Sequence, residues 1–234
     1  MITPKICQDY FARFCIFKIR METLKELHRD MANALTHGMG ILFGVASIPV
    51  LSAVGAKTGN VSGIVGATIY AFCFLMLFTF STIYHSTQNA EAKKILRTLD
   101  HVSIFFLIAG TYTPFLLIYM LDSFGITLLS VQWSLVLLGI IFKIFFTGRF
   151  RFASTLVYVA MGWLLLVGGN RFFVVLPTPV LVMLMIGGGL YTLGSIFYLN
   201  KKIYHHHAIW HLFVLSAAIC HYVAVLLAVM LKRG

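Results

Sequence analysis

The 234-residue chain is 60% hydrophobic and only 11% charged, whereas soluble domains average about 45–50% apolar and 25% charged residues. This composition excludes an ordinary soluble domain, and the long apolar runs predict a helical integral membrane protein rather than a β-barrel. The net charge of +11 would suggest nucleic acid in a soluble protein, but the basic residues lie between the apolar runs, so we expect no nucleic-acid partner and a contact with membrane lipids instead.

The first 36 residues carry six Lys/Arg and four acidic residues, so charges interrupt every apolar patch. No small-residue cleavage site follows a continuous apolar run, which argues against a signal peptide. We predict a cytoplasmic or interfacial segment over residues 1–36, in which residues 22–36 form an amphipathic helix at the membrane interface. Met21 is an alternative start, in which case residues 1–20 would be a non-native extension.

Seven apolar segments follow, and each is close to the ~20 residues that a helix needs to cross a bilayer. We therefore predict an all-α fold in which residues 37–231 form a bundle of seven transmembrane helices. Gly40-x-x-x-Gly44 and the glycine run at 187–189 predict close approach between helices. The predicted spans are residues 37–56, 61–84, 101–121, 125–146, 152–170, 178–199 and 206–231.

Basic residues set the predicted orientation. Fourteen of the eighteen Lys/Arg fall in the N-terminal segment or near the second, fourth and sixth loops. Because positive charge concentrates on the cytoplasmic side, we predict a multi-pass protein of the inner or plasma membrane, with its N-terminus in the cytoplasm and its C-terminus outside.

Cysteines predict neither a disulfide framework nor a thiolate metal site, because they show no CxxC spacing and two of them lie within apolar runs. We expect them to be small packing residues. They are Cys7, Cys15, Cys73 and Cys220.

Histidines mark the last apolar segment, where His207 and His211 are four residues apart and His221 follows. Positions i and i+4 share one helix face, and His221 returns to within about 40° of that face. Ionisable side chains inside a membrane are functional candidates because burying them without a partner is costly.

The predicted topology brings polar groups from four helices to one level near the cytoplasmic boundary. Helix periodicity and the charge count lead to this convergence independently. The residues are Asp30, Asn33 and His37 at the first span, Ser81 and His85 at the end of the second, Asp100 and His101 at the start of the third, and His207 and His211 at the start of the seventh.

Such a cluster suits Zn²⁺. Three imidazoles leave a fourth tetrahedral position open, as in catalytic zinc sites, where zinc brings the pKa of water to about 7. A carboxylate at Asp100 can orient that water and take its proton. Ser81 lies one turn from His85 on the same face, so we expect its hydroxyl to hydrogen-bond the water or a substrate carbonyl. The predicted ligands are His85, His207 and His211, and the residues expected to surround them are Asp30, Asn33, His37 and His221.

Two other interpretations of the same residues stay open: a buried hydrogen-bonded network that fixes helix packing, and a proton or ion pathway. A bis-histidine haem site fits poorly, because no other span offers a mid-membrane histidine to face His221.

Five motifs over residues 22–231 resemble the haemolysin III family, which is grouped with the progestin and adipoQ receptors and is more distantly similar to the alkaline ceramidases. Upstream of Asn33 the family usually has Glu residues, whereas this chain has Arg29-Asp30, so the acidic role there falls to Asp30. The motifs are Asn33-Ala-Leu-Thr-His37-Gly, Ser81-Thr-Ile-Tyr-His85, Leu99-Asp100-His101, Gly110-Thr-Tyr-Thr-Pro-Phe and His207-Ala-Ile-Trp-His211.

The resemblance implies a seven-helix fold with zinc held by His85, His207 and His211, and with Asp100 beside the water on the metal. It further implies amide hydrolysis of ceramide-like lipids, so we expect a zinc-dependent lipid amide hydrolase acting near the cytoplasmic face. One alternative is a non-enzymatic membrane receptor or sensor with structural zinc. The other, which the family name implies for some members, is a pore-forming cytolysin, although no polar pore lining is evident in the spans.

Overall fold

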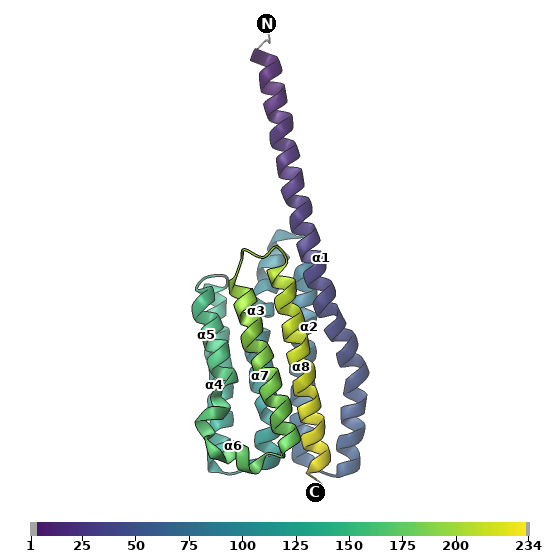
Figure 1. The fold of residues 1–234 in the computed structure, drawn as a ribbon, viewed down its shortest axis with the longest axis vertical. Helices are drawn as coiled ribbons and strands as arrows, with labels where there is room; N and C mark the ends of the chain where they lie inside the picture. The colour runs from purple at the N-terminus through teal and green to yellow at the C-terminus, as the bar shows by residue number, and fades with distance from the viewer. Residues whose placement is uncertain (1–3, 233–234) are drawn as a thin grey trace.

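The computed structural model describes the backbone of residues 4–232 and the side chains of residues 13–232 (Figure 1). The expectations for Cys7 and for residues 1–20 therefore fall wholly or partly outside the described side chains. Every regular element within residues 4–232 is a helix, which confirms the all-α class. The elements are α1 (Pro4–Thr58), α2 (Val61–Ser86), α3 (Ala90–Tyr119), α4 (Ser123–Phe146), α5 (Arg151–Gly162), the 3₁₀ helix η1 (Leu164–Gly168), α6 (Asn170–Val175), α7 (Thr178–Leu199) and α8 (His206–Leu231).

Six helices within the described chain are long and apolar enough to cross a membrane: α1, α2, α3, α4, α7 and α8. The predicted spans at 178–199 and 206–231 coincide with α7 and α8 residue for residue. Composition and length located these helices because their apolar runs are uninterrupted.

The predicted fifth span, residues 152–170, is not one continuous helix. α5 has 12 residues, about 18 Å at 1.5 Å per residue, against a hydrocarbon core of ≈ 30 Å. η1 follows, and Gly169 then takes φ +53°, a conformation that suits glycine and interrupts the helix before α6. The described chain thus has six helices of spanning length, not the predicted seven.

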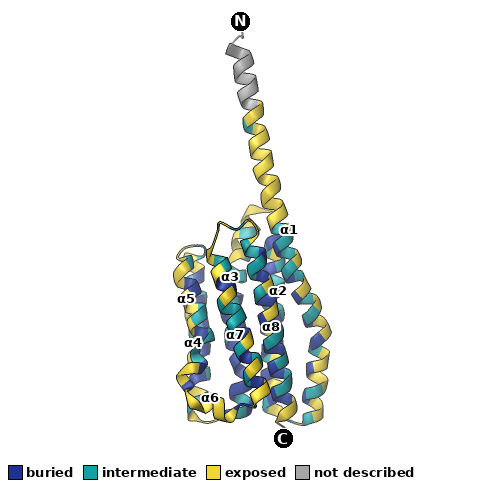
Figure 2. Cartoon of the chain, in the orientation of Figure 1, coloured by how far each residue is buried: buried dark blue, intermediate teal, exposed yellow. Residues whose placement is uncertain are grey.

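α1 is one helix of 55 residues, about 80 Å long, and it continues without a break past the predicted boundary at residue 36. Its N-terminal part extends beyond the rest of the bundle in Figure 1, and residues 13–29 are exposed apart from the half-buried Cys15 (Figure 2). Pro49 lies inside the helix, as expected for a residue tolerated in a span. The predicted interfacial segment and first span are therefore parts of a single rod.

Close helix packing occurs where the glycine patterns predict it. α1 lies against α2 and α8, and a Cβ at Gly40 would come within 2.2 Å of the Phe78 ring on α2. α7 packs on α8 in the same way, since a Cβ at Gly187 would lie 2.3 Å from the His221 ring. Glycine at both positions lets polar and aromatic rings approach the neighbouring backbone.

A three-residue connection links α2 to α3 and aligns the residues needed for a site. The side chain of Asn89 accepts hydrogen bonds from the amides of Glu91 and Ala92, so α3 begins at Ala90, eleven residues before the predicted start at 101. The last turn of α2, with His85, and the third turn of α3, with Asp100, are thereby held at the same end of the bundle.

Candidate metal centre

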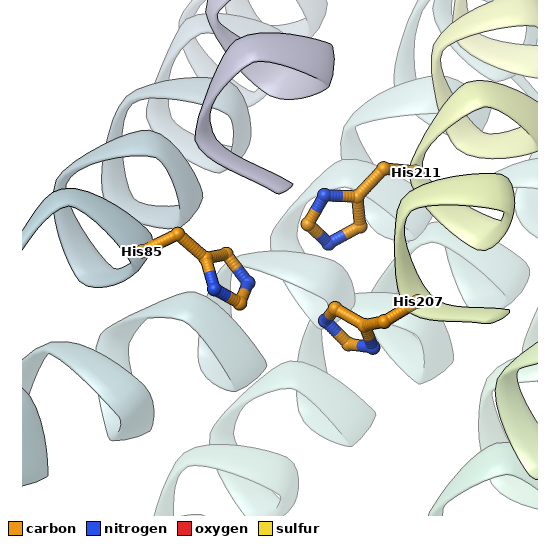
Figure 3. A group of neighbouring side chains, drawn as sticks. All are labelled: His85, His207 and His211. Atoms are coloured by element: carbon orange, nitrogen blue, oxygen red, sulfur yellow. The ribbon is translucent and has the colours of Figure 1, made fainter. Parts of the chain in front are cut away.

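Three histidines from two helices meet inside the bundle (Figure 3). His85 comes from the last turn of α2, and His207 and His211 come from the first two turns of α8. One ring nitrogen of each lies within 4.8 Å of the others. We expected these three residues at one level from the sequence, and the structure brings their side chains together. We call the three residues the histidine cluster. The end of the bundle that contains them is called the histidine end.

The His211 ring is 2% exposed and is fixed by α1. Its Nδ1 lies 3.1 Å from the backbone oxygen of Asn33 and 3.3 Å from the hydroxyl oxygen of Thr36. A carbonyl oxygen only accepts hydrogen bonds, so Nδ1 carries the proton and donates to Asn33. The lone pair on Nε2 is left available for a metal ion.

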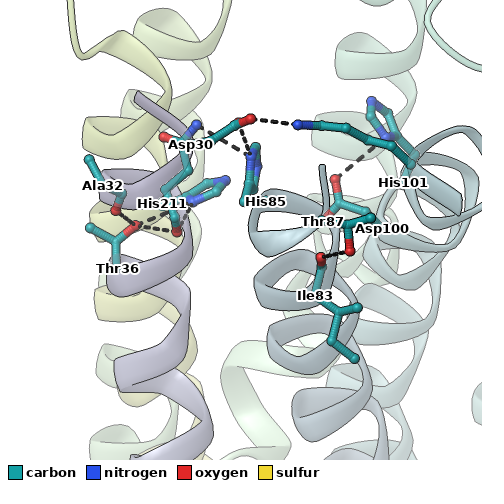
Figure 4. Close-up of polar contacts among 11 residues, drawn as sticks. Asp30, Ala32, Thr36, Ile83, His85, Thr87, Asp100, His101 and His211 are labelled. Carbon is teal, nitrogen blue, oxygen red and sulfur yellow. Dashed lines mark hydrogen bonds and ion pairs between the residues drawn. The ribbon is translucent and has the colours of Figure 1, made fainter. Parts of the chain in front are cut away.

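The His85 ring is oriented by a carboxylate (Figure 4). Its Nδ1 lies 3.0 Å from Oδ1 of Asp30, and Oδ2 of Asp30 accepts a hydrogen bond from Lys93. The Asn33 amide is 3.4 Å from the same ring nitrogen. With the Nδ1 proton directed at Asp30, the lone pair of His85 faces the cluster from Nε2, the carboxylate–histidine arrangement common to metal sites.

His85 Nε2 is buried and has no hydrogen-bond partner among residues 13–232. A buried nitrogen left without a partner costs about 1–3 kcal/mol. Zinc–nitrogen bonds of ≈ 2.0–2.1 Å in a tetrahedron place ligand atoms roughly 3.4 Å apart, so the cluster reaches that spacing with small side-chain rotations. The donor set therefore fits a zinc ion with three protein ligands and a fourth position open.

His207 differs from the other two because its ring is only partly buried and no hydrogen bond to it is seen within residues 13–232. Its ring centroid lies 4.5 Å from that of His211 and 5.2 Å from that of His85. His207 also lines the adjoining cavity, as His211 does.

That cavity, of about 110 Å³, is bounded mainly by α3, α5, α7 and α8. Asp100, His207 and His211 all line it at the histidine end. Oδ2 of Asp100 is 3.6 Å from Nδ1 of His101 (Figure 4). The same ring nitrogen lies closer, at 2.7 Å, to the backbone oxygen of Arg97. A carboxylate and two imidazoles of the cluster thus share one mostly apolar chamber.

The remaining expected residues divide into two groups. His37 packs against the histidine cluster, because its ring stacks on that of His211 with centroids 3.6 Å apart. His221 lies ten residues beyond His211 on α8 and contacts Leu184 and Tyr191 instead. Ser81 is completely buried one turn from His85, and its hydroxyl has no partner among residues 13–232. Ser81 is not among the described residues that line the cavity.

Two contacts were not expected from the sequence: Thr36 with His211, and Lys93 with Asp30. Thr36 lies three residues after Asn33, on the same helix face, so its position carried a usable signal. Lys93 carried none, since its charge was accounted for by membrane topology.

Comparison with known proteins shows the family of the chain. The family model described as "Haemolysin-III related" matches residues 25–222. The chain belongs to the haemolysin III family. Among its relatives, the "Hemolysin-3 homolog" of Bacillus subtilis (strain 168) is 44% identical over 206 residues, 88% of this chain and 95% of the relative. "Hemolysin-3" of Bacillus cereus is 43% identical over 201 residues, 86% of this chain and 92% of the relative.

A more distant relative of this haemolysin III protein is the human "Monocyte to macrophage differentiation factor", 31% identical over 170 residues and covering 68% of each chain. No solved structure matches the chain. Family membership and the six apolar helices together make it a multi-pass membrane protein, and the resemblance found in the sequence motifs is confirmed.

Proposed function

We propose that this haemolysin III protein is a zinc-dependent lipid amide hydrolase with its centre at the histidine cluster. The observation that carries the proposal is Nε2 of His85, which is buried without a hydrogen-bond partner among residues 13–232 and lies beside two further imidazoles. Those imidazoles, of His207 and His211, line an apolar cavity that is also lined by a carboxylate. His85, His207 and His211 would hold the ion, which would supply a Lewis acid and activate water near neutral pH.

The chain's own residues have separable tasks. Asp30 and the Asn33 carbonyl hold the protons of His85 and His211 on Nδ1, which keeps both Nε2 atoms basic. Asp100 is the one acidic side chain among the described residues that line the cavity, and its carboxylate would accept a proton there. The apolar walls would hold acyl chains and exclude bulk water.

Zinc analysis of the purified protein, together with Asp100→Asn, tests the proposal. Asn keeps the shape of Asp but cannot take a proton, so we expect zinc to be retained and release of fatty acid from ceramide to fall about 10²–10⁴-fold. Wild-type protein that purifies without zinc from zinc-replete cells would refute the metal site. Retained zinc with no amide hydrolysis by the wild type would refute the reaction alone.

A non-enzymatic receptor or sensor is the second candidate. It is favoured because the expected zinc ligands come from two different helices. An ion bound by His85 and by the α8 pair would link α2 to α8. Zinc-dependent binding of a lipid without turnover would support it. The names of the bacterial relatives raise cytolysis as a third candidate, which release of dye from liposomes by the purified protein would test.

The orientation is part of the proposal: N-terminus cytoplasmic, C-terminus outside, in the cell membrane. It rests on the Lys/Arg asymmetry and on Figure 1, where α1 begins and α8 ends at opposite ends of the bundle. We infer that α5, η1 and α6 together make a broken seventh crossing. Labelling of single cysteines introduced near Arg20 and at Lys232 in intact cells tests the orientation. Thiol reagents that do not cross the membrane should label only the cysteine introduced at position 232.

A further inference from the structure

The cavity beside the histidine cluster is elongated along the helix axes. On α8 its lining extends from His207 to His221, and on α3 from Asp100 to Tyr112. At 1.5 Å per residue these stretches are about 21 and 18 Å long. The chamber therefore reaches well beyond the metal site, and its far end contains polar groups of its own.

Two of these groups, Tyr191 on α7 and His221 on α8, form what we call the deep pair. Their ring centroids are 5.5 Å apart, and both residues line the cavity. His221 is 8% exposed. The Tyr191 hydroxyl and Nδ1 of His221 are both buried without a hydrogen-bond partner among residues 13–232.

The contacts of His221 determine what the deep pair can bind. Its Nε2 lies 3.3 Å from the backbone oxygen of Leu184, so Nε2 carries the proton and Nδ1 is a free acceptor. The ring is seated against Gly187, where a Cβ would be 2.4 Å from Nε2. The absence of a side chain at Gly187 thus leaves the space that the imidazole occupies.

The Tyr191 hydroxyl can donate as well as accept a hydrogen bond. A ligand atom between the two side chains would have to donate to Nδ1 of His221 and accept from Tyr191. An alcohol hydroxyl meets both demands. A carbonyl oxygen cannot donate to Nδ1, and a carboxylate would bring a charge into an apolar wall.

We propose that the deep pair binds a hydroxyl group on the hydrocarbon chain of an amphiphile whose head group lies at the histidine end. The inference rests on the proposed function only in assigning the head group to that end. His221 is ten residues, about 15 Å, beyond His211. With C–C bonds near 1.5 Å at tetrahedral angles, about 12 bonds of an extended chain cover that distance.

Paired probes test this inference on the full-length protein in nanodiscs. We would measure 12-hydroxyoctadecanoate, 2-hydroxyoctadecanoate and octadecanoate as competitors of one fluorescent fatty acid. Two hydrogen bonds to one hydroxyl predict about tenfold tighter binding of the 12-hydroxy chain than of the plain chain. Tyr191→Phe and His221→Leu should each reduce that ratio to about threefold, because each removes one of the two partners, and the double variant should reduce it to near unity.

Tyr112→Phe is the matched control. Tyr112 also lines the cavity, but its hydroxyl already donates to the Gly162 oxygen and accepts from the Leu165 amide. This variant should keep the preference for the 12-hydroxy chain even if it weakens binding of all probes, since the ratio of affinities is independent of the folded fraction.

Four results would overturn the inference. In the wild type these are equal affinity for the 12-hydroxy and the plain chain, an equally tight binding of the 2-hydroxy chain, and no competition by any probe. The fourth is a preference for the 12-hydroxy chain that is undiminished in both deep-pair variants. Zinc content measured on the same samples separates this outcome from the proposed function. Metal-free wild type that retains the preference would refute the zinc site and leave the hydroxyl site standing.

Discussion

The two ends of the cavity present opposite chemistry. At the histidine end, neighbours on α1 occupy the Nδ1 atoms of His85 and His211, so that lone pairs converge on one point. At the far end, Tyr191 and His221 offer one donor and one acceptor to a single small group. Converging lone pairs call for a cation, and a donor beside an acceptor calls for a neutral hydroxyl.

The comparison shows that the same residue type is specialised by what holds its other nitrogen. His211 and His221 lie on one helix, and each has one ring nitrogen facing a backbone carbonyl. For His211 the free nitrogen lies near two more imidazoles, whereas the ring of His221 lies beside the phenol ring of Tyr191. Substitutions at each end should therefore have separate effects.

The largest expected effect is loss of the metal in His211→Ala. Removing one of three ligands should reduce bound zinc from about one ion per chain to nearly none, measured by elemental analysis of the monodisperse fraction. His211→Cys should recover part of the zinc because a thiolate is also a zinc ligand.

His205→Ala is the control, since His205 is an exposed histidine next to the same helix. It should leave the zinc content unchanged. Full zinc occupancy in His211→Ala would contradict the assignment of this residue as a ligand and remove the contrast between the two ends.

Asp30→Asn should have the next largest effect. It replaces the carboxylate that accepts the Nδ1 proton of His85 and pairs with Lys93, and loss of such a partner typically lowers metal affinity 10–100-fold. Glu91→Gln is the control, because it breaks only the exposed Glu91–Lys94 pair at 2.8 Å. Competition with a zinc chelator measures both; equal affinities would show that Asp30 does not support the site.

The histidine end could be predicted from the sequence because helix periodicity and the charge count agree there. The spacing of His207 and His211 places both on one face of α8, and the charge count placed that face at the same level as His85. The contact of Thr36 was missed although its helix face carried a signal, and the contact of Lys93 could not be predicted, because it depends on how α1 is rotated against its neighbours. That rotation is set by packing at positions such as Gly40, which hydropathy does not encode.

The fold shows the same limit. Uninterrupted apolar runs gave α7 and α8 to the residue, but the run at 152–170 contains three glycines, at positions 162, 168 and 169, and forms α5 and η1 before α6 begins. Hydropathy measures transfer into lipid and not helix continuity, so this break was not predicted. The position of Ser81 was also predicted only in part. Helix periodicity placed it on the face of His85, but the structure buries it away from the cavity.

Gly187→Ala addresses the deep end. The added Cβ would lie 2.3 Å from Cδ2 of His221 and must displace that ring, which predicts a loss of stability of about 1–3 kcal/mol. Binding of 12-hydroxyoctadecanoate should weaken while zinc content stays unchanged. Gly189→Ala is the control, since a Cβ there meets no atom within 4 Å; equal melting temperatures for the two variants would contradict the tight packing.

Ser81→Ala should have the smallest effect. The Ser81 hydroxyl is buried, has no partner among residues 13–232 and is not in the cavity wall, so its removal discards an unsatisfied group. We expect unchanged zinc content, unchanged amide hydrolysis and no loss of thermal stability. A clear fall in the turnover rate with zinc retained would instead show that the hydroxyl reaches the substrate, as its position one turn from His85 first suggested. The histidine end would then extend past the cavity wall into α2, and the division between the two ends would need to be redrawn around Ser81.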